Sequence, residues 1–404
     1  MKQQCLWTSE IATNTIQDNK ATSSSSPEYK SLVHSCKDQS SPNQQTKHSN
    51  TQQELQFHTK MALTKSLITS TAGKSIATLL FLTLTTYLLY RLRRHINRTK
   101  PISVDYHFTR KCNKTCKFCF HTEKTSFVAS SDDMERGLRL LKAAGMRKIN
   151  FAGGEPFLYP DKLGWLCQFC KQELRLESVS IITNGTKVSA KWLEKYGRFV
   201  DVMGVSCDSF DERTNEAIGR GTGENVKQLF RIRDWCREMG IKFKLNTVVC
   251  KLNWQEDMAA TVAELAPQRW KCFQVLFVED ENDAQAADAV SDKRKRDARD
   301  LLISGEQFEA FCEKHKHLEA FVPEPNDLMA SSYLILDEYL CFLDKGQGKE
   351  RQSRSILEVG VAKALEEVKF DQEAFMQRGG LYAWSKDEQE GDGCGSATAK
   401  ELEW

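Results

Sequence analysis

The sequence predicts an α/β fold, an open partial barrel of six βα units, and three observations support this prediction. From residue 102 onward, short apolar runs typical of strands alternate with longer segments in which apolar residues recur at helical spacing. Regular alternation of this kind is typical of a parallel sheet covered by helices. Glycine-rich or polar sequences follow several strands, where functional groups of such folds gather. Six units are too few to close an eight-stranded barrel, so we expect an open one.

The elements follow one another regularly along the barrel. We expect strands over Ile102–Phe108, Lys148–Ala152, Val179–Thr183, Val200–Ser206, Ile241–Val249 and Trp270–Val278, and helices near residues 131–144, 161–174, 189–197, 224–239 and 254–265. The charged, irregular stretch 279–300 is interpreted as a solvated insertion rather than a binding patch. Gly305–His317 looks helical, and Tyr333–Leu343 is apolar and compact. We assign residues 101–280 to the barrel and 281–404 to a C-terminal extension.

Two further regions precede the barrel. Residues 1–60 are rich in Ser, Thr, Gln, Asn and Lys and lack a periodic apolar face, so we expect them to be disordered. Residues 61–100 contain the uncharged run Ser75–Tyr90, followed by a cluster of arginines. Sixteen helical residues span roughly 24 Å, less than the ~30 Å hydrocarbon core of a bilayer. A short spanning helix and a helix lying in the interface both stay open, and a buried core helix is the less favoured alternative. The arginines would keep the downstream domain cytosolic.

Composition narrows the functional class. The chain has 57 Lys and Arg against 55 Asp and Glu, so its bulk charge does not indicate a nucleic-acid partner. Its 14 cysteines show no paired spacing of a disulfide framework, and no cleavable signal peptide is visible. We therefore expect an intracellular protein with free thiols.

The most informative motif is Cys112-x-x-x-Cys116-x-x-Cys119, just after the first expected strand. Three cysteines so close together can hold one [4Fe–4S] cluster, which takes four ligands, and leave one iron open. An open iron is the signature of radical S-adenosylmethionine (SAM) enzymes, where the amino and carboxylate groups of SAM occupy it. A zinc knuckle or unrelated buried thiols are the alternatives, but zinc sites normally use paired C-x-x-C or Cys/His sets.

The ends of later strands carry groups suited to a nucleoside ligand. Gly153-Gly154-Glu155-Pro156 follows the second strand, where the glycines would let backbone pass close to a ligand and Glu155 could accept from an ammonium group. Asn184 follows the third strand, and Ser206 and Asp208 follow the fourth, all suited to a ribose or purine. Helix capping by Asp208 or Ser209 explains the latter equally well.

Cations recur along strands that should face the barrel interior. Lys148 begins the second strand, Lys242 and Lys244 alternate along the fifth with Asn246, and Arg269 and Lys271 flank Trp270 in the sixth. Alternate strand residues share a face, so several cations would point into one cavity. An anionic substrate such as a polyphosphate is the economical explanation, although any single lysine could point to water. Cys167-x-x-Cys170 lies in a helical pattern and is interpreted as packing.

Long strings elsewhere resemble the viperin family of radical SAM enzymes. They include Tyr106–Arg110, Phe118–Thr122, Thr125–Val128, Lys148–Phe151, Cys207–Glu212, Ile218–Gly221, Arg269–Lys271 and Ser332–Tyr339. The similarity runs from about residue 104 to Trp404. It implies a partial (βα)6 radical SAM barrel, with the C-terminal extension completing a nucleotide pocket.

The resemblance also implies a reaction. One electron, from an electron donor, would enter the cluster and cleave SAM, and the resulting 5′-deoxyadenosyl radical would take the ribose 4′ hydrogen of CTP. Loss of water would give 3′-deoxy-3′,4′-didehydro-CTP, a chain terminator with an antiviral role. The family further implies attachment to the cytosolic face of the endoplasmic reticulum, or to lipid droplets, and recruitment of the cytosolic iron–sulfur assembly machinery through Trp404.

Site residues carry over by position. The resemblance implies triphosphate ligands at Lys148, Lys244, Lys271 and Arg378, with Asn246 and Arg269 lining the same cavity. It implies that Phe118 contacts SAM and that Arg220 binds either the SAM carboxylate or a phosphate. Tyr333 resembles a proton or hydrogen donor near the sugar. Three parts of the chain depart from the family. Asp105 stands where vertebrate relatives carry an amide, Lys345–Arg354 matches poorly, and the N-terminal 100 residues are unlike the vertebrate amphipathic helix in detail. The alternatives are a radical SAM enzyme for another nucleotide such as UTP, and a membrane-tethered iron–sulfur adaptor.

Overall fold

The computed structural model describes residues 55–63, 65, 71–98, 100–279, 281–284, 296–344 and 352–387. Its central feature is one twisted sheet in the order β10-β9-β8-β1-β2-β3-β4-β5-β6-β7. The strands are β1 Ser103–His107, β2 Lys148–Ala152, β3 Ser178–Thr183, β4 Val202–Ser206, β5 Lys242–Val249, β6 Arg269–Gln274, β7 Phe321–Glu324, β8 Ile335–Leu336, β9 Cys341–Leu343 and β10 Gln352–Ser355. The pairs from β8 through β1 to β7 are all parallel, whereas β8–β9 and β9–β10 are antiparallel.

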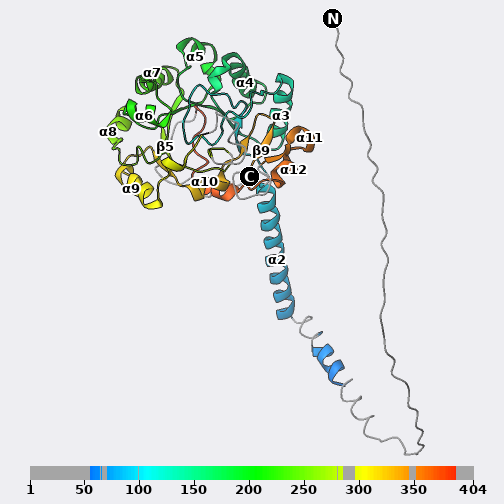
Figure 1. Cartoon of the computed structure of the whole chain (residues 1–404). Coiled ribbons are helices and arrows are strands. Elements are labelled where there is room, and N and C mark those ends of the chain that lie inside the picture. The colour runs from blue at the N-terminus through cyan, green and yellow to red at the C-terminus, as the bar shows by residue number, and fades with distance from the viewer. Residues whose placement is uncertain are drawn as a thin grey trace, which may run out of the picture. The chain divides into compact units, whose positions relative to one another are not determined.

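Helices lie outside the strands, as Figure 1 shows for α3 to α9 around the barrel. They are α3 Ser131–Ala143, α4 Pro160–Gln172, α5 Ala190–Tyr196, α6 Glu212–Ile218, α7 Asn225–Glu238, α8 Ala259–Leu265, α9 Gly305–His315, α10 Asn326–Ser332, α11 Ile356–Val359, α12 Val361–Glu366 and α13 Gln372–Gln377. Short 3-10 helices span Pro156–Leu158, Gly197–Phe199 and Arg299–Leu301. Because the described sheet does not pair β7 with the opposite edge, the barrel is open, as predicted.

The strand pattern places apolar residues outward and polar residues inward. Val104 and Tyr106 of β1 are buried in the hydrophobic core, which lies between the sheet and the helices, and so are Leu245 and Trp270 of neighbouring strands. Alternating residues of the same strands face the barrel interior. Helix starts are set by ordinary caps, for example Ser304, which forms a capping box with Gln307 at α9. The interior is thus left free for polar side chains.

The C-terminal part of the chain belongs to the same sheet. β7 pairs in parallel with β6, and β8 pairs in parallel with β1, so residues after 281 extend both edges of the six-stranded core. The boundary that we placed at residue 280 therefore falls inside one sheet. The sequence also missed α6, which has only seven residues, and it started α8 five residues too early because a turn at residues 251–255 and three irregular residues precede the helix.

The stretch 279–300 differs from the predicted solvated insertion at three of its described residues, while residues 285–295 lie outside the described residues. Asn282 and Ala298 are fully buried, and Asp283 is 6% exposed. Asn282 donates hydrogen bonds to the carbonyls of Phe118 and Leu276. These ends of the stretch pack against the cysteine loop, because their polar groups satisfy its backbone. Cys167 and Cys170, by contrast, are both buried in the core from α4, which confirms their interpretation as packing.

The N-terminal region contains helical residues. Residues 55–63 are helical, so the predicted disordered segment ends in a helix, while residues 1–54 lie outside the described residues. Helix α2, Thr71–Arg98, contains the whole apolar run that we singled out, and its Leu79, Phe81 and Leu88 are exposed. Neither α2 nor another helix in the described part of the chain is long and apolar enough to cross a bilayer.

Candidate functional site

One cavity of about 330 Å³ lies inside the barrel. Residues of strands β1 to β6 line it, together with the cysteine loop, α10, α13 and the segment that follows α13. The cysteine loop lies at the carboxyl end of β1, whereas Lys148 is the first residue of β2 and lies toward the opposite end. The cavity therefore has a cysteine end and a cation end, and we use these two names below.

All three motif cysteines line the cysteine end. The loop that carries them is attached to the end of α6, where the Thr115 and Lys117 amides donate to the Gly219 and Ile218 carbonyls at 3.0 Å each. Burial raises the pKa of each thiol, to about 11 for Cys112 and about 12 for Cys116. Metal binding by these residues would therefore release protons, as expected for thiolate ligands.

The two glycines of Gly153-Gly154 allow backbone to approach the cysteine loop. A Cβ atom on Gly154 would lie 1.9 Å from the Lys111 carbonyl oxygen, and one on Gly153 would lie 2.3 Å from that of Thr109. Gly153 also has a φ of 128°, which disfavours other residues. The Gly154 amide donates to the Thr109 carbonyl at 2.8 Å. Besides lining the cavity, the glycines therefore hold the cysteine loop in place.

Glu155 does not line the cavity in this structure. It is fully buried, and its carboxylate accepts from the Thr183 hydroxyl at 2.7 Å and from the amides of Asn184 and Phe157. Burial raises its pKa, and these hydrogen bonds oppose the shift. Glu155 also positions Asn184, whose side-chain amide lies 3.8 Å from the Cys112 sulfur, and its contact with an ammonium group stays a prediction.

Asp208 and Arg220 form a buried ion pair beside the cysteine loop. The other carboxylate oxygen of Asp208 accepts from the Val248 amide at 2.9 Å, and the Arg220 guanidinium lies 5.8 Å from the ring centre of Phe118. Asp211 caps α6, so the capping explanation for Asp208 is wrong. The pair places a cation next to the three thiols at the cysteine end.

A second ionic network, which the sequence did not indicate, surrounds the far side of the loop. Arg110 donates to Glu338 at 2.8 Å and to Glu281 at 3.1 Å, and its guanidinium also donates to the Thr122 carbonyl. Glu281 accepts from the Thr122 amide in turn. The network ties three distant parts of the sequence around the cysteine loop, and only folding brings them together.

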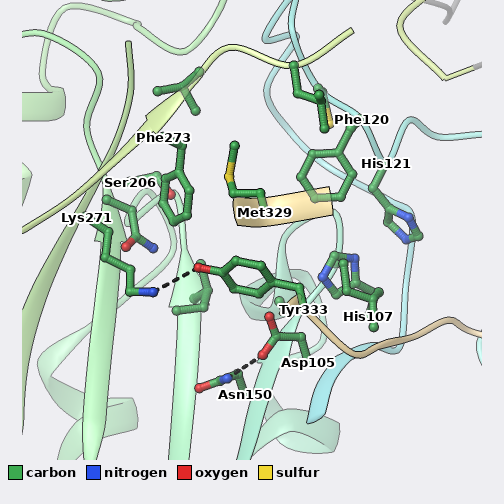
Figure 2. A pocket seen from close by; sticks show the side chains of 18 of the residues that line it. Asp105, His107, Phe120, His121, Asn150, Ser206, Lys271, Phe273, Met329 and Tyr333 are labelled. Carbon is green, nitrogen blue, oxygen red and sulfur yellow. Dashed lines mark hydrogen bonds between the residues drawn. The ribbon is translucent and has the colours of Figure 1, made fainter. Parts of the chain in front are cut away.

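The cation end contains Lys271, Glu324, Tyr333 and Arg378 in mutual contact. The Lys271 ammonium donates to the Tyr333 hydroxyl at 2.8 Å and pairs with Glu324, as Figure 2 shows for Lys271 and Tyr333. Arg378 pairs with the same carboxylate at 3.3 Å and lies 3.8 Å from the Tyr333 ring centre. Burial would raise the pKa of Glu324, but the two cations hold it below its ordinary value.

Tyr333 is kept in its protonated form. Burial raises the pKa of its hydroxyl well above the ordinary value, and Glu324 adds to this effect by accepting from it at 3.1 Å. Figure 2 also shows the Asp105–Asn150 pair lining the same cavity. Asp105 therefore uses one oxygen to accept from an amide within the protein.

The innermost cations surround Tyr382 of the segment after α13. Lys148 lies 2.9 Å from the Tyr382 hydroxyl, and the Arg269 guanidinium lies 4.4 Å from its ring centre. Arg269 does not line the cavity, because it is the first residue of β6 and its side chain stacks on Tyr382. Lys244 and Asn246 do line it from β5, and the side-chain oxygen Oδ1 of Asn246 is buried without a hydrogen-bond partner among the described residues.

Comparisons with known proteins agree with this geometry. Residues 106–265 match the family model of the radical SAM superfamily. The chain is 49% identical over 290 residues to the S-adenosylmethionine-dependent nucleotide dehydratase RSAD2 of Oncorhynchus mykiss, covering 71% of this chain and 81% of that protein. It is 32% identical to an S-adenosylmethionine-dependent nucleotide dehydratase of Flammeovirga pacifica, covering 70% and 96%. The chain belongs to the viperin (RSAD2) family.

Another relative is RSAD2 of Danio rerio, at 49% identity over 71% of this chain and 79% of that protein. Among solved structures, the chain is similar to anSMEcpe with bound AdoMet, with a TM-score of 0.49 and 15% identity over 70% of this chain and 88% of that one.

The residues present fit the cofactors of the viperin family. The three thiols that line the cavity can supply three ligands of a [4Fe–4S] cluster, and no fourth cysteine among the described residues lines it. The open position suits SAM, for which the cysteine end offers Asn184, Ser206 and the Arg220 guanidinium beside Phe118. The family implies both the cluster and SAM.

The structure gathers most residues that the sequence singled out. The following line the one cavity: Cys112, Cys116, Phe118, Cys119, Lys148, Gly153, Gly154, Asn184, Ser206, Asp208, Arg220, Lys244, Asn246, Lys271, Tyr333 and Arg378. Glu155 and Arg269 lie behind it. Trp404 and most of Lys345–Arg354 lie outside the described residues. Sequence reasoning missed Glu324 and Tyr382, for which the only signal was their closeness in sequence to Tyr333 and Arg378.

Proposed function

We propose that this protein converts CTP to 3′-deoxy-3′,4′-didehydro-CTP. The observation that carries the proposal is the shared cavity, which has three thiols at one end and Lys148, Lys244, Lys271 and Arg378 at the other. A nucleoside triphosphate has a matching polarity, with a reactive sugar at one side and up to four negative charges at the other. Lysine and arginine are the usual ligands of such phosphates. Membership of a nucleotide dehydratase family supports the same assignment.

Cys112, Cys116 and Cys119 would hold the [4Fe–4S] cluster, which together with SAM would supply the radical chemistry. The chain's own residues would do the rest. The cations hold the triphosphate so that the ribose lies between them and the cysteine end. Enclosure by the barrel keeps water away from the reacting carbon. Tyr333, which is held protonated between Lys271 and Glu324, is placed to give a proton or hydrogen near the sugar.

An anaerobic turnover assay tests the proposal. The reconstituted protein is reduced with dithionite in the presence of SAM and CTP, UTP, ATP or GTP, and 5′-deoxyadenosine and the dehydrated nucleotide are quantified. We expect CTP to stimulate both products well above the control without nucleotide. Cys116→Ala protein is the matched negative control. If CTP gives no more than the control, the substrate assignment is wrong.

Two other outcomes are informative. Stimulation by UTP or another nucleotide instead of CTP would place the protein among nucleotide dehydratases of different base preference. No stimulation by any nucleotide, with the cluster intact, would favour a membrane-tethered adaptor. We favour catalysis because an adaptor has no need of buried cations such as Lys148 and Lys271 behind its cluster.

We also propose that α2 attaches the enzyme to the cytosolic surface of the endoplasmic reticulum or to lipid droplets. Its exposed Leu79, Leu80 and Phe81 suit an apolar interface, and basic residues follow them in the sequence. Flotation with vesicles of phosphatidylcholine and phosphatidylserine measures this. We expect the full chain to float, and the variant Leu80→Asp/Phe81→Asp to float less. Equal flotation of both proteins would contradict a role for α2.

The remaining partners are proposals of the same standing. An antiviral role follows from the proposed product, since a nucleotide that lacks a 3′ hydroxyl terminates RNA chains.

Trp404 is proposed to recruit the cytosolic iron–sulfur assembly machinery, and an electron donor must reduce the cluster. Iron content of Trp404→Ala protein purified from cells tests the first partner, with a drop expected. Unchanged iron would contradict it.

A further inference from the structure

Two cations at the innermost part of the cavity, together with Arg269 behind it, make no salt bridge with a described carboxylate, and only Asp105 acts electrostatically on one of them, Lys244. The two are Lys148 and Lys244, whereas Lys271 and Arg378 share Glu324. Lys148 is 5% exposed. Enclosed cations without a counter-charge are costly, so this part of the cavity needs an anionic partner.

Tyr382 is the group that faces all three. Its hydroxyl lies 2.9 Å from the Lys148 ammonium, its ring lies under the Arg269 guanidinium, and Lys244 interacts with it electrostatically. Burial would raise the pKa of Tyr382, but Lys148, Lys244 and Arg269 lower it to about 7. The hydroxyl can therefore change its charge near neutral pH, unlike an ordinary tyrosine.

The segment that carries Tyr382 is firmly docked at the amino-terminal side of the strands. Ser178 of β3 donates to the Trp384 carbonyl at 3.2 Å, and Lys242 of β5 donates to the Ala383 carbonyl at 2.8 Å. The Lys386 amide donates to Asp201 at 3.2 Å. Tyr382 thus belongs to a built floor of the cavity, and its hydroxyl has a defined position.

The floor lies at the far end from the three thiols. Lys148 begins β2 and Gly153 follows its end, a distance of about 16 Å at ~3.3 Å per residue. Since the sugar must lie toward the cysteine end to react, successive phosphates extend toward the floor. The last phosphate of a triphosphate is the one that reaches Lys148 and Lys244.

We propose that Tyr382 is a binding residue that recognises the terminal phosphate of the substrate. Without substrate, its phenol oxygen serves as the counter-charge of Lys148, Lys244 and Arg269. When a triphosphate enters, the terminal phosphate pairs with Lys148 and Lys244, and Tyr382 takes up a proton from solvent and donates a hydrogen bond to that phosphate. A diphosphate is too short to make this exchange. The proposal rests on the proposed function, because it assumes a nucleoside triphosphate.

Calorimetric titration tests it with the full chain, its cluster reconstituted and SAM present. CTP and CDP are titrated into wild-type and Tyr382→Phe protein at pH 7.5, in two buffers with different ionisation enthalpies. Phenylalanine keeps the ring under Arg269 and removes only the hydroxyl. Tyr339→Phe, which changes an exposed tyrosine outside the cavity, is the matched control.

We expect two effects of Tyr382→Phe. The preference for CTP over CDP should fall roughly tenfold or more, as for a lost hydrogen bond to a charged group. Proton uptake per CTP should be larger in the wild type than in Tyr382→Phe protein by about half a proton or more, since the free tyrosine is largely ionised at this pH. Titration of the phosphates themselves is common to both proteins and cancels in the difference. An unchanged preference for CTP over CDP together with equal proton uptake would overturn the proposal and show that Tyr382 only packs at the base of the cavity.

Inorganic tripolyphosphate separates this proposal from the assignment of CTP. If CTP is not turned over, tripolyphosphate can still bind Lys148 and Lys244. Proton uptake on tripolyphosphate binding that occurs in the wild type but not in Tyr382→Phe protein would then support the role of Tyr382. Equal uptake by both proteins overturns it. Failure of CTP turnover with a positive tripolyphosphate result would therefore count against the substrate alone.

Discussion

The two ends of the cavity are built in different ways. The cysteine end comes from one loop of eight residues, Cys112–Cys119, and is held mainly by backbone contacts such as those at Gly154 and Gly219. The cation end draws single side chains from β2, β5, β6, β7 and the segment around α13, and they are held by charge. A change at the first end should therefore abolish the chemistry, whereas changes at the second should have graded effects.

Loss of a thiol should have the largest effect. Cys116→Ala leaves two thiolates for the cluster, so we expect no detectable 5′-deoxyadenosine and a loss of cluster absorbance after reconstitution. Cys312→Ala is the control, because Cys312 lies on α9, outside the cavity. Residual turnover by Cys116→Ala protein would mean that the cysteine end does not work as a three-ligand site.

Removal of one cation should be severe but not complete. Lys271→Met loses hydrogen bonds to Tyr333 and Glu324, together with a phosphate contact, and we expect kcat/KM for the nucleotide to fall about 100-fold. 5′-Deoxyadenosine formed without nucleotide should be unchanged, because the cysteine end is intact. Lys227→Met on the exposed face of α7 is the control. A loss equal to that of Cys116→Ala would contradict the graded behaviour of the cation end.

Neutralisation of the buried carboxylate should affect stability more than binding. Glu324→Gln leaves Lys271 and Arg378 without their counter-charge, and we expect a loss of about 3 kcal/mol in unfolding free energy, measured by urea titration. The pKa of Glu324 lies below its ordinary value, so this stability is present above that value and disappears only as the pH falls through the lowered one. Nucleotide affinity should be retained. Glu238→Gln, on the surface of α7, is the control, and an equal midpoint for both variants would refute the pairing.

The pH dependence of nucleotide binding should show the smallest effect. Burial lowers the pKa of Lys244 to about 8, and Lys148 acts in the same direction whereas Tyr382 acts against it. The charge of Lys244 is therefore lost as the pH rises through 8, and KM for the nucleotide should increase up to about tenfold per unit above it. Lys244→Arg keeps its charge and should make the profile between pH 8 and 9 less steep, whereas the slope that comes from proton uptake by Tyr382 should remain. Equal slopes for wild-type and Lys244→Arg protein would show that Lys244 stays protonated.

Much of the barrel could be predicted from the sequence. The predicted bounds of the strand Lys148–Ala152 agree with those of β2 at both ends. The six core strands and their parallel order follow from local patterns of apolar residues. The position of the cysteine loop after β1 follows in the same way. Interactions between residues close in sequence suffice for these features, because strand periodicity and ligand spacing are local properties.

Other parts of the site have no local signal. Glu324 comes 53 residues after Lys271, and Tyr382 comes 234 residues after Lys148, yet each pair is in contact. Glu155 shows a related limit of the sequence: its motif is plain, but the hydrogen bonds that its carboxylate accepts from Thr183 and Asn184 are not. Side-chain direction depends on which hydrogen-bond partners the folded chain supplies, and spacing alone does not reveal it.

Local patterns in the sequence were thus enough to predict the open α/β barrel, three closely spaced thiols after β1 and an excess of inward-facing cations. The groups that balance those cations, Glu324 between Lys271 and Arg378 and Tyr382 beside Lys148, come together only in the folded chain. A charge placed in a cavity must be compensated by whatever group lies nearest in space. In this protein those groups come from β7 and from the segment after α13, which reach the cations only when the sheet is complete.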